Sequence, residues 1–316
     1  MSIPRLRHAR NAGGCLHWEI VSRFRSHRAA DHVAAESGER AHGAEPAVPP
    51  ETLEGWYSLH QVFRLDRAAL RKLPGEARAE MASAAGDALD EMAAPAAGGW
   101  TGVVELAGSR ADVMLVHFRP TLDEIRAVQR RLACVPLSDH LKTVYTFLSV
   151  TEAGLYHLTA AVARDRQTAG GVVGDAEYRR IMTERAAVER GSAHVERRLF
   201  PPRPADMPYV CFYPMSKRRA VGQNWYELSL DERSRLMQAH GATGRRYAGR
   251  VQQVITGAIG LDAWEWGVTL FARDPLDIKK LVTDMRFDEV SAQYAEFGDF
   301  YVGRLVEPAE WAAAVA

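Results

Sequence analysis

The stretch VQQVITGAIGLDAWEWGVTLFA, residues 251–272, contains two strand-like runs on either side of a glycine-bounded connection. The runs cover residues 251–256 and 264–272, and Gly257 and Gly260 lie between them. Short runs rich in apolar and β-branched residues, separated by glycine, are typical of neighbouring strands. The stretch therefore predicts a strand pair around which the C-terminal half of the chain can be placed.

Helices and strands flank this pair in a regular order. A strand at 209–214 and a helix that begins after Ser229 precede it, and Ser229 with Glu232 three residues later predicts a capping box. A helix over 274–285 and a strand over 297–306 follow it. The order is β-α-β-β-α-β, which is that of a ferredoxin-like unit.

The N-terminal half repeats this order, and Thr121 with Glu124 predicts a second capping box there. Its predicted strands and helices cover 56–65, 66–92, 102–106, 112–118, a helix from 121, and 143–150. The segment that follows is less regular: 156–164 fits a helix or an extended run, and 175–189 is a charged helix. We therefore predict the α+β class, with two tandem ferredoxin-like units that form a dimeric α/β-barrel-like subunit.

The 316-residue chain divides into three predicted parts. Residues 1–48 are rich in arginine and then in small and polar residues, which predicts a flexible N-terminal extension. Residues 49–205 form the N-terminal ferredoxin-like half, and residues 206–316 form the C-terminal half.

The composition excludes some classes of protein. The 40 basic residues balance the 40 acidic ones, whereas a nucleic-acid-binding protein usually carries a marked basic excess. No apolar run approaches the roughly 20 residues that span a bilayer. The three cysteines show no metal-ligand spacing, and so sparse a set is typical of a reducing compartment. We expect a cytoplasmic protein with no nucleic-acid partner and no membrane span.

His240 is the first candidate for a site residue. The helix that begins after Ser229 places Leu236 and His240 on one face, next to Gly241 and Gly244, whose small size would let a flat ligand approach. A hydrogen-bonded histidine with no ligand is the more common case, but imidazole is also the usual proximal ligand of haem iron. The helix alone leaves both interpretations open.

A second group of candidates lies on the strand that begins at 209. Tyr213, Met215 and Lys217 occupy alternate positions and therefore share one face. Pro214 cannot donate to a ladder, which predicts that this strand is an edge strand or ends there. The tyrosine and the lysine could hold a carboxylate between them, or the lysine could be an ordinary exposed residue.

Gln253 lies between Val251 and Ile255 on a face that we expect to be buried. A buried amide needs a hydrogen-bond partner. It is either a satisfied structural amide or a neutral group next to a bound oxidant.

Three further residues could bind carboxylates. Arg286 and Ser291 follow the helix over 274–285, and Arg198 precedes the second half. Each alone is usually a solvated surface residue. In a site, the guanidinium groups would suit bidentate binding of carboxylates.

Four strings carry a resemblance to a known family. They are VCFYPMSKRR (210–219), NWYELSLDERSRLMQAHGATGRRYAG (224–249), VQQVITGAIGLDAWEWGVTLF (251–271) and MRFDEVSAQYAEFGDFYVG (285–303). In these strings the chain resembles the chlorite dismutase-like superfamily and, within it, the coproheme decarboxylases of the Gram-positive type. The resemblance covers about residues 51–306 and places the haem site in the C-terminal half.

The resemblance implies a role for each candidate. His240 would be the axial ligand of the porphyrin iron, and Tyr213 would be the residue oxidised to a radical. Lys217 would assist at the second propionate. Gln253 takes the place of the distal arginine of true chlorite dismutases, which argues against chlorite chemistry. The residues that would bind propionates are Arg198, Met215, Arg286 and Ser291.

The implied reaction is the oxidative decarboxylation of iron coproporphyrin III (coproheme) to haem b by hydrogen peroxide, through an intermediate with three propionates. The porphyrin would be both the substrate and the redox centre. The resemblance also implies a homopentamer, and a ferrochelatase as the partner that supplies coproheme. The alternatives are a haem-binding or haem-transfer protein without turnover, and a chlorite dismutase or peroxidase.

Overall fold

The computed structural model describes residues 48–315, and the predicted N-terminal extension lies almost wholly outside them. The strands are β1 (Thr52–Leu65), β2 (Trp100–Leu106), β3 (Val113–Arg119), β4 (Leu141–Gly154), β5 (Tyr209–Lys217), β6 (Val251–Gly257), β7 (Trp266–Ala272), β8 (Ala295–Phe297) and β9 (Tyr301–Val306). The α-helices are α1 (Arg67–Leu70), α2 (Gly75–Ala93), α3 (Leu122–Ala133), α4 (Tyr156–Thr168), α5 (Ala176–Arg190), α6 (Ala193–Leu199), α7 (Leu230–Arg245), α8 (Pro275–Arg286), α9 (Glu289–Tyr294) and α10 (Pro308–Val315). Two 3-10 helices are η1 (Pro136–His140) and η2 (Trp225–Glu227). The predicted α+β class is confirmed.

The strands form one antiparallel sheet in the order β7-β6-β4-β1-β3-β2-β9-β5-β8, and β5 also pairs with β7. The N-terminal strands run β4-β1-β3-β2, and the C-terminal strands run β6-β7-β5-β9. The two sets join where β4 pairs with β6 and where β2 pairs with β9. Eight strands therefore each have two neighbours, and the sheet closes on itself.

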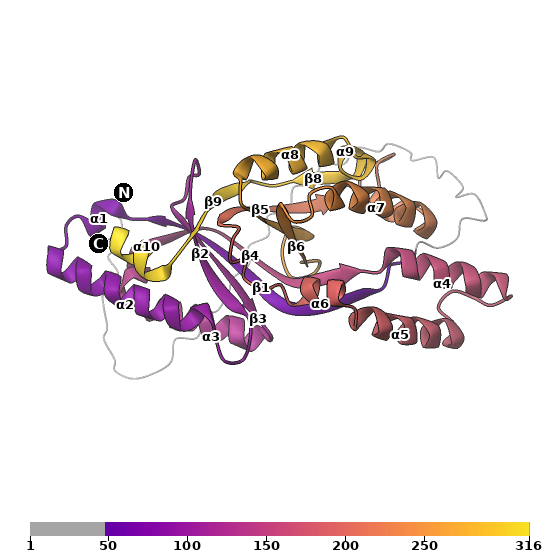
Figure 1. The fold of residues 1–316 in the computed structure, drawn as a ribbon, viewed down its shortest axis with the longest axis horizontal. Coiled ribbons are helices and arrows are strands. Elements are labelled where there is room, and N and C mark those ends of the chain that lie inside the picture. The colour runs from indigo at the N-terminus through magenta and orange to yellow at the C-terminus, as the bar shows by residue number, and fades with distance from the viewer. Residues whose placement is uncertain (1–47, 316) are drawn as a thin grey trace, which may run out of the picture. The chain divides into compact units, whose positions relative to one another are not determined.

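Helices cover the outer face of this closed sheet. Helices α2, α3 and α10 lie over the N-terminal strands, whereas α7, α8 and α9 lie over the C-terminal strands (Figure 1). Aromatic side chains, among them Phe118, Phe147, Phe212 and Phe271, fill the inside of the sheet and are fully buried. A separate cluster between β5, β7 and α8 contains Tyr213. Within the described residues, no helix is both long enough and apolar enough to cross a bilayer.

Pro214 was predicted to lie on an edge strand or at a strand end, and this is wrong. β5 continues to Lys217 and has neighbours on both sides, β7 on one and β9 with β8 on the other. β9 pairs with residues 209–212, whereas β8 pairs with residues 215–217. Pro214 faces the break between these two short strands, where its carbonyl accepts from the backbone of Gly298 at 2.9 Å. A proline in a central strand is tolerated there because no ladder donor is needed at the break.

Some of the other predicted helices and strands are confirmed by the structure, and others differ from it. Thr121 and Glu124 form the complete capping box, and Ser229 accepts from the backbone N–H of Glu232. The ambiguous run at 156–164 is helical, as part of α4. The single strand predicted over 297–306 is instead two strands, β8 and β9, while the short helices α6, α9 and α10 were not predicted.

Candidate functional site

Strand β5 brings three predicted site residues to one face. Tyr213, Met215 and Lys217 alternate along it, and Tyr213 and Met215 pack in the cluster that lies beneath α8. On β7 the directly opposite residues are Val268 for Tyr213 and Trp266 for Met215. The prediction that the three candidates share a face agrees with this register.

Tyr213 is buried at 9% exposure within an aromatic group. Its ring stacks on Phe300 with centroids 4.5 Å apart and is tilted against Phe297 at 5.9 Å. Burial raises the pKa of Tyr213 well above its usual value, the adjacent thiol of Cys211 adds to this, and the charge of Arg286 opposes it. The phenol therefore keeps its proton at neutral pH, and Arg286 lies close enough to affect it.

Lys217 is a buried cation rather than an exposed one. It is 8% exposed, and its Nζ lies 4.3 Å from the centroid of the Trp225 ring. Burial lowers the pKa of Lys217 to about 8, while the carboxylates of Asp288 and Glu265 act in the opposite direction. At pH 7 the ammonium is mostly charged and is stabilised by the indole face and by these two carboxylates.

The side chain of His240, on α7, has a defined partner. Its Nδ1 forms a hydrogen bond with Oδ2 of Asp288, the N-cap residue of α9. Burial by itself would raise the pKa of Asp288, but the hydrogen bond from His240 and the charges nearby lower it overall. An ionised carboxylate can only accept, so Nδ1 carries the proton and Nε2 is left with a lone pair for a metal.

Gln253 lies across from α7 on β6. A Cβ added to Gly244 would lie 3.1 Å from Nε2 of Gln253 and 3.2 Å from Cε of Met285. Gly244 thus allows α7 to approach the glutamine closely. The face of Gln253 is not uniformly buried as expected, because Val251 is buried but Ile255 is 37% exposed.

The predicted propionate-binding residues lie around this region. Arg286 extends over the ring of Phe297 with its guanidinium carbon 3.6 Å from the centroid. Arg198 is exposed on α6, yet partial desolvation and then the neighbouring charge of Arg245 lower its pKa. Ser291 is buried in α9, three residues after Asp288.

Sequence reasoning missed three residues that shape the site. Asp288 holds His240, Trp225 covers Lys217, and Arg245 lies beside Arg198. A Cβ on Gly241 would lie 3.2 Å from the guanidinium of Arg245, so this arginine runs along α7 next to His240. Asp288 directly precedes Glu289, and an aspartate at such a position is a typical helix N-cap. No local sequence signal connects it with His240, which is 48 residues away.

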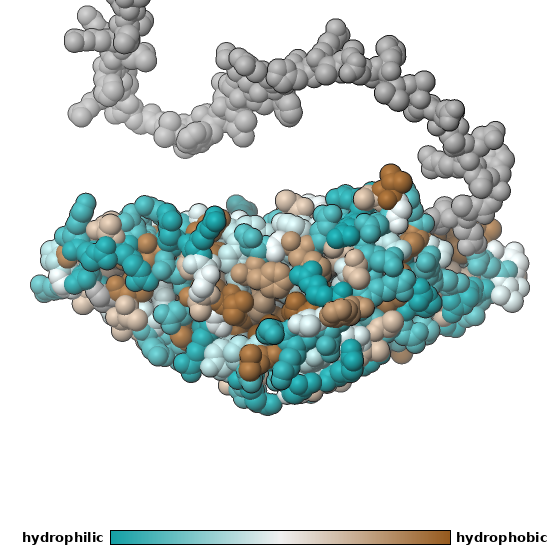
Figure 2. Space-filling view, turned by 90° about the horizontal axis from the view of Figure 1, so that it is seen from above, coloured by the Kyte–Doolittle hydropathy of each residue, from teal (hydrophilic) through white to brown (hydrophobic). Residues whose placement is uncertain are grey.

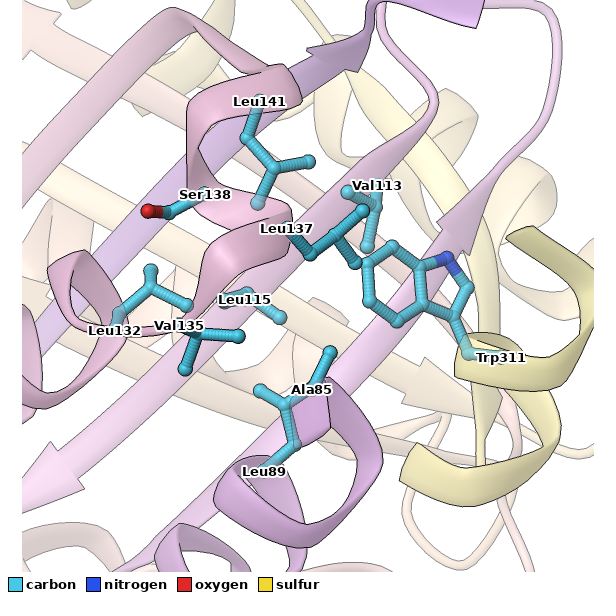
Figure 3. A pocket seen from close by; sticks show the side chains of 10 residues that line it. All are labelled: Ala85, Leu89, Val113, Leu115, Leu132, Val135, Leu137, Ser138, Leu141 and Trp311. Atoms are coloured by element: carbon cyan, nitrogen blue, oxygen red, sulfur yellow. The ribbon is translucent and has the colours of Figure 1, made fainter. Parts of the chain in front are cut away.

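A small cavity lies elsewhere and does not match the site. Ala85, Leu89, Leu137 and Trp311 are among the side chains that line it, in the helix-covered core of the N-terminal half (Figure 3). Its volume of about 10 Å³ holds at most a single water molecule. It is a packing gap and cannot accept an organic ligand.

The residues around β5 and α7 fit an iron tetrapyrrole with several carboxylates. One imidazole offers a free nitrogen. Four cations lie on the elements of this region, namely Lys217 against Trp225, Arg286 against Phe297, and Arg198 beside Arg245. Among residues 48–315, no three His, Cys, Asp or Glu side chains gather as they would around a protein-held metal ion. A single histidine ligand is what a metal already held by a macrocycle requires.

Comparison with known proteins supports the same family. Residues 78–306 match the model of the chlorite dismutase family. A coproheme decarboxylase of Staphylococcus carnosus is 38% identical over 258 residues, which cover 81% of this chain and 94% of the relative. A putative heme-binding protein of Halobacterium salinarum is 42% identical over 273 residues, and these cover 85% of this chain but 51% of that longer protein.

Solved structures agree with the sequence comparison. A structure described as a novel heme-binding protein of Thermus thermophilus superposes with a TM-score of 0.70 at 38% identity, covering 86% of this chain and 98% of the other. The extent of these matches, together with the arrangement of the sheet and helices, shows that the chain belongs to the chlorite dismutase family.

Proposed function

We propose that this protein is a coproheme decarboxylase, which uses hydrogen peroxide to convert iron coproporphyrin III into haem b through a three-propionate intermediate. The identity with a named coproheme decarboxylase over most of both chains supports the proposal. The observation that carries it is the placement of buried Tyr213 and Lys217 on one strand face, near a histidine that Asp288 fixes with Nε2 free.

The substrate would be held by its iron and by its carboxylates. Nε2 of His240 would ligate the iron, and Arg198, Arg286 and Ser291 would bind propionates, with Met215 packing against the macrocycle. The iron centre of the substrate would provide the electrons that reduce peroxide. The ionised Asp288 keeps His240 in the tautomer that binds iron and strengthens it as a ligand.

Tyr213 would carry the oxidising equivalent to a propionate. Because its pKa is raised, the phenol is present as O–H and can give up a hydrogen atom. It can then remove one from the β-carbon of the propionate, which takes the first of the two electrons that the reaction requires. The second electron would pass to the oxidised iron centre of the substrate as carbon dioxide leaves and a vinyl group remains. Lys217 would hold the carboxylate of the second propionate by its charge. Gln253 would provide a neutral amide on the distal side.

A direct test is to mix the purified protein with iron coproporphyrin III, add hydrogen peroxide in steps, and separate the porphyrins by mass. The proposal expects haem b, preceded by a species that has lost one carboxyl group. Tyr213→Phe should bind the substrate and form no haem b. Tyr209→Phe is the matched control, because Tyr209 lies on the same strand face four residues earlier and should turn over normally.

The test separates the alternatives. Tight binding with no change in mass would favour a haem-binding or haem-transfer protein, as the names of the Halobacterium and Thermus proteins suggest for them. Release of oxygen from added chlorite would favour a chlorite dismutase. Normal turnover by Tyr213→Phe would refute the role proposed for this tyrosine.

The assembly is part of the proposal. Phe300, just before β9, and Val302, within it, are 38% and 37% exposed, and hydrophobic side chains gather near the middle of the face in Figure 2. Such surface is consistent with packing against further subunits. The homopentamer, the ferrochelatase contact and the cytoplasmic location stay predictions, and sedimentation of the purified protein would test the first.

A further inference from the structure

Glu152 lies at the border of the sheet face that carries Tyr213 and Lys217. It is near the end of β4, where Glu54 on β1 is its direct cross-strand partner. Glu54 is exposed, whereas Glu152 is partly buried. Like charges directly opposite each other in a sheet are unfavourable, so the charge of Glu54 makes the ionised form of Glu152 less stable.

The surroundings of Glu152 are built to accept a carboxyl group. Nε1 of Trp266 donates to Oε1 of Glu152 at 3.1 Å. A Cβ on Gly257 would overlap Oε2 of Glu152, so the glycine leaves room for the carboxyl group against β6. The titratable groups that face it are Glu54 on β1 and Tyr156 on α4.

Among the described residues, no positive charge balances this carboxylate. Within residues 48–315, no basic side chain forms an ion pair with Glu152. Burial raises the pKa of Glu152, the hydrogen bond from Trp266 opposes this, and the charge of Glu54 adds to the increase. At a given pH, a larger fraction of Glu152 than of an ordinary exposed glutamate is therefore protonated.

Trp266 connects Glu152 with the candidate site. On β7 it pairs with Gly257 of β6 on one side and with Met215 of β5 on the other. Met215 lies between Tyr213 and Lys217 on the same face of β5. The carboxyl group thus lies one indole away from the residues proposed to bind the substrate.

The proposed reaction consumes protons. For each propionate the balance is R–CH2–CH2–COO⁻ + H2O2 + H⁺ → R–CH=CH2 + CO2 + 2 H2O. The propionate loses two electrons as the C–C bond to the carboxylate breaks and a β C–H bond is lost, and peroxide gains these electrons as its O–O bond breaks. One proton must therefore enter the site for every carboxylate that leaves.

We propose that Glu152 is the acid that supplies this proton, and that Glu54 returns a proton to it from solvent. The inference rests on the proposed function, because the need for a proton comes from that reaction. The O–H bond of Glu152 breaks as its proton passes, by way of water beside Trp266, to the oxygen of peroxide that leaves as water. A proton taken from solvent and relayed by the exposed Glu54 then restores the O–H bond.

The variant Glu152→Gln removes the acidic proton of residue 152 and keeps the size and shape of its side chain. Glutamine is neutral, can still accept from Trp266 and fits above Gly257, but it cannot release a proton. General acids contribute about 10²- to 10⁴-fold to rate, so we expect turnover to fall at least tenfold with unchanged coproheme affinity. Glu54→Gln should give a smaller loss, and Glu105→Gln, at an exposed position on β2, should behave as wild type.

A second readout needs no substrate. In an infrared pH titration of the ligand-free protein, the C=O band of one carboxylic acid should persist to a higher pH than the bands of the ordinary glutamates, because burial raises the pKa of Glu152. Glu152→Gln should lack this band. In Glu54→Gln the same band should disappear at a lower pH, because one cause of the raised pKa is gone.

The outcomes are distinct. Wild-type turnover in Glu152→Gln across the pH range would overturn the inference. An infrared titration in which no carboxylic acid of the wild type outlasts the ordinary glutamates as pH rises would overturn it too. A loss of rate that follows an equal loss of affinity would also overturn it, since the residue would then only shape the site. If the wild-type protein does not decarboxylate coproheme, the proposed function fails, and the infrared result still reports on Glu152.

Discussion

Replacing Asp288 with asparagine should weaken coproheme binding by changing the tautomer of His240. Asparagine keeps an oxygen that can accept from the backbone of Val290, as Oδ1 of Asp288 does at 2.9 Å, so the start of α9 is preserved. The side chain loses the ionised acceptor that Nδ1 of His240 contacts. If the amide N–H faces Nδ1, the imidazole proton moves to Nε2, and that tautomer cannot bind iron.

The expected magnitude follows from the burial and geometry of this pair. The Asp288 side chain is 7% exposed and that of His240 is 28% exposed, so water replaces the lost partner poorly. Removing the residue that orients a metal-binding histidine typically costs 10- to 100-fold in affinity. This corresponds to about 1.4 to 2.7 kcal/mol. Asparagine and aspartate cap helices about equally well, so fold stability should change by only a few tenths of a kcal/mol.

The assay is a titration of ligand-free protein with iron coproporphyrin III at pH 7, followed by absorbance, with urea unfolding of each variant. Asp284→Asn is the matched control, because this carboxylate on α8 accepts from the hydroxyl of Tyr247 at 2.8 Å rather than from His240. A dissociation constant for Asp288→Asn within threefold of wild type would refute the reasoning, provided that His240→Ala binds weakly.

Two further predictions concern pH. Burial lowers the pKa of His60 and His117 to about 3 each, so the folded chain binds fewer protons than the unfolded chain between pH 3 and 6.5. Stability should then fall as pH falls below 6.5, by about 2 kcal/mol per histidine at pH 5, and urea unfolding of His60→Gln should show a shallower loss; an unchanged slope would contradict this. The pKa of Lys217 is lowered to about 8, so stability should rise between pH 8 and 10.5, by up to about 3 kcal/mol. Lys217→Met should abolish that rise in the ligand-free protein while weakening coproheme binding, and a persistent rise would argue against this assignment.

Much of the fold could be predicted because its signals are local. The alternation on β5 places Tyr213, Met215 and Lys217 on one face, and the capping box of Thr121 sets the start of α3. Both depend on residues a few positions apart. The repeated β-α-β-β-α-β order was visible for the same reason.

The wrong predictions concern residues whose environment depends on strand pairing or helix packing far along the chain. Pro214 has a local preference for strand edges, but its tolerance in a central strand depends on the gap between β8 and β9. Likewise, Ile255 shares a face with Gln253, yet whether that face is covered depends on where α7 lies. Periodicity assigns a side chain to a face but does not say what packs against the face.

The sequence by itself determined the α+β class, the order of the elements and the residues that resemble a tetrapyrrole site. Only the tertiary structure joined His240 to Asp288, 48 residues apart, and Glu152 to Trp266, 114 residues apart. The physical reason is that helix caps and strand alternation are fixed by neighbours along the chain, whereas the partner of a buried polar group is fixed by strand register and helix packing. The polar pairs that tune the candidate site are therefore decided by the closed sheet and the helices that cover it.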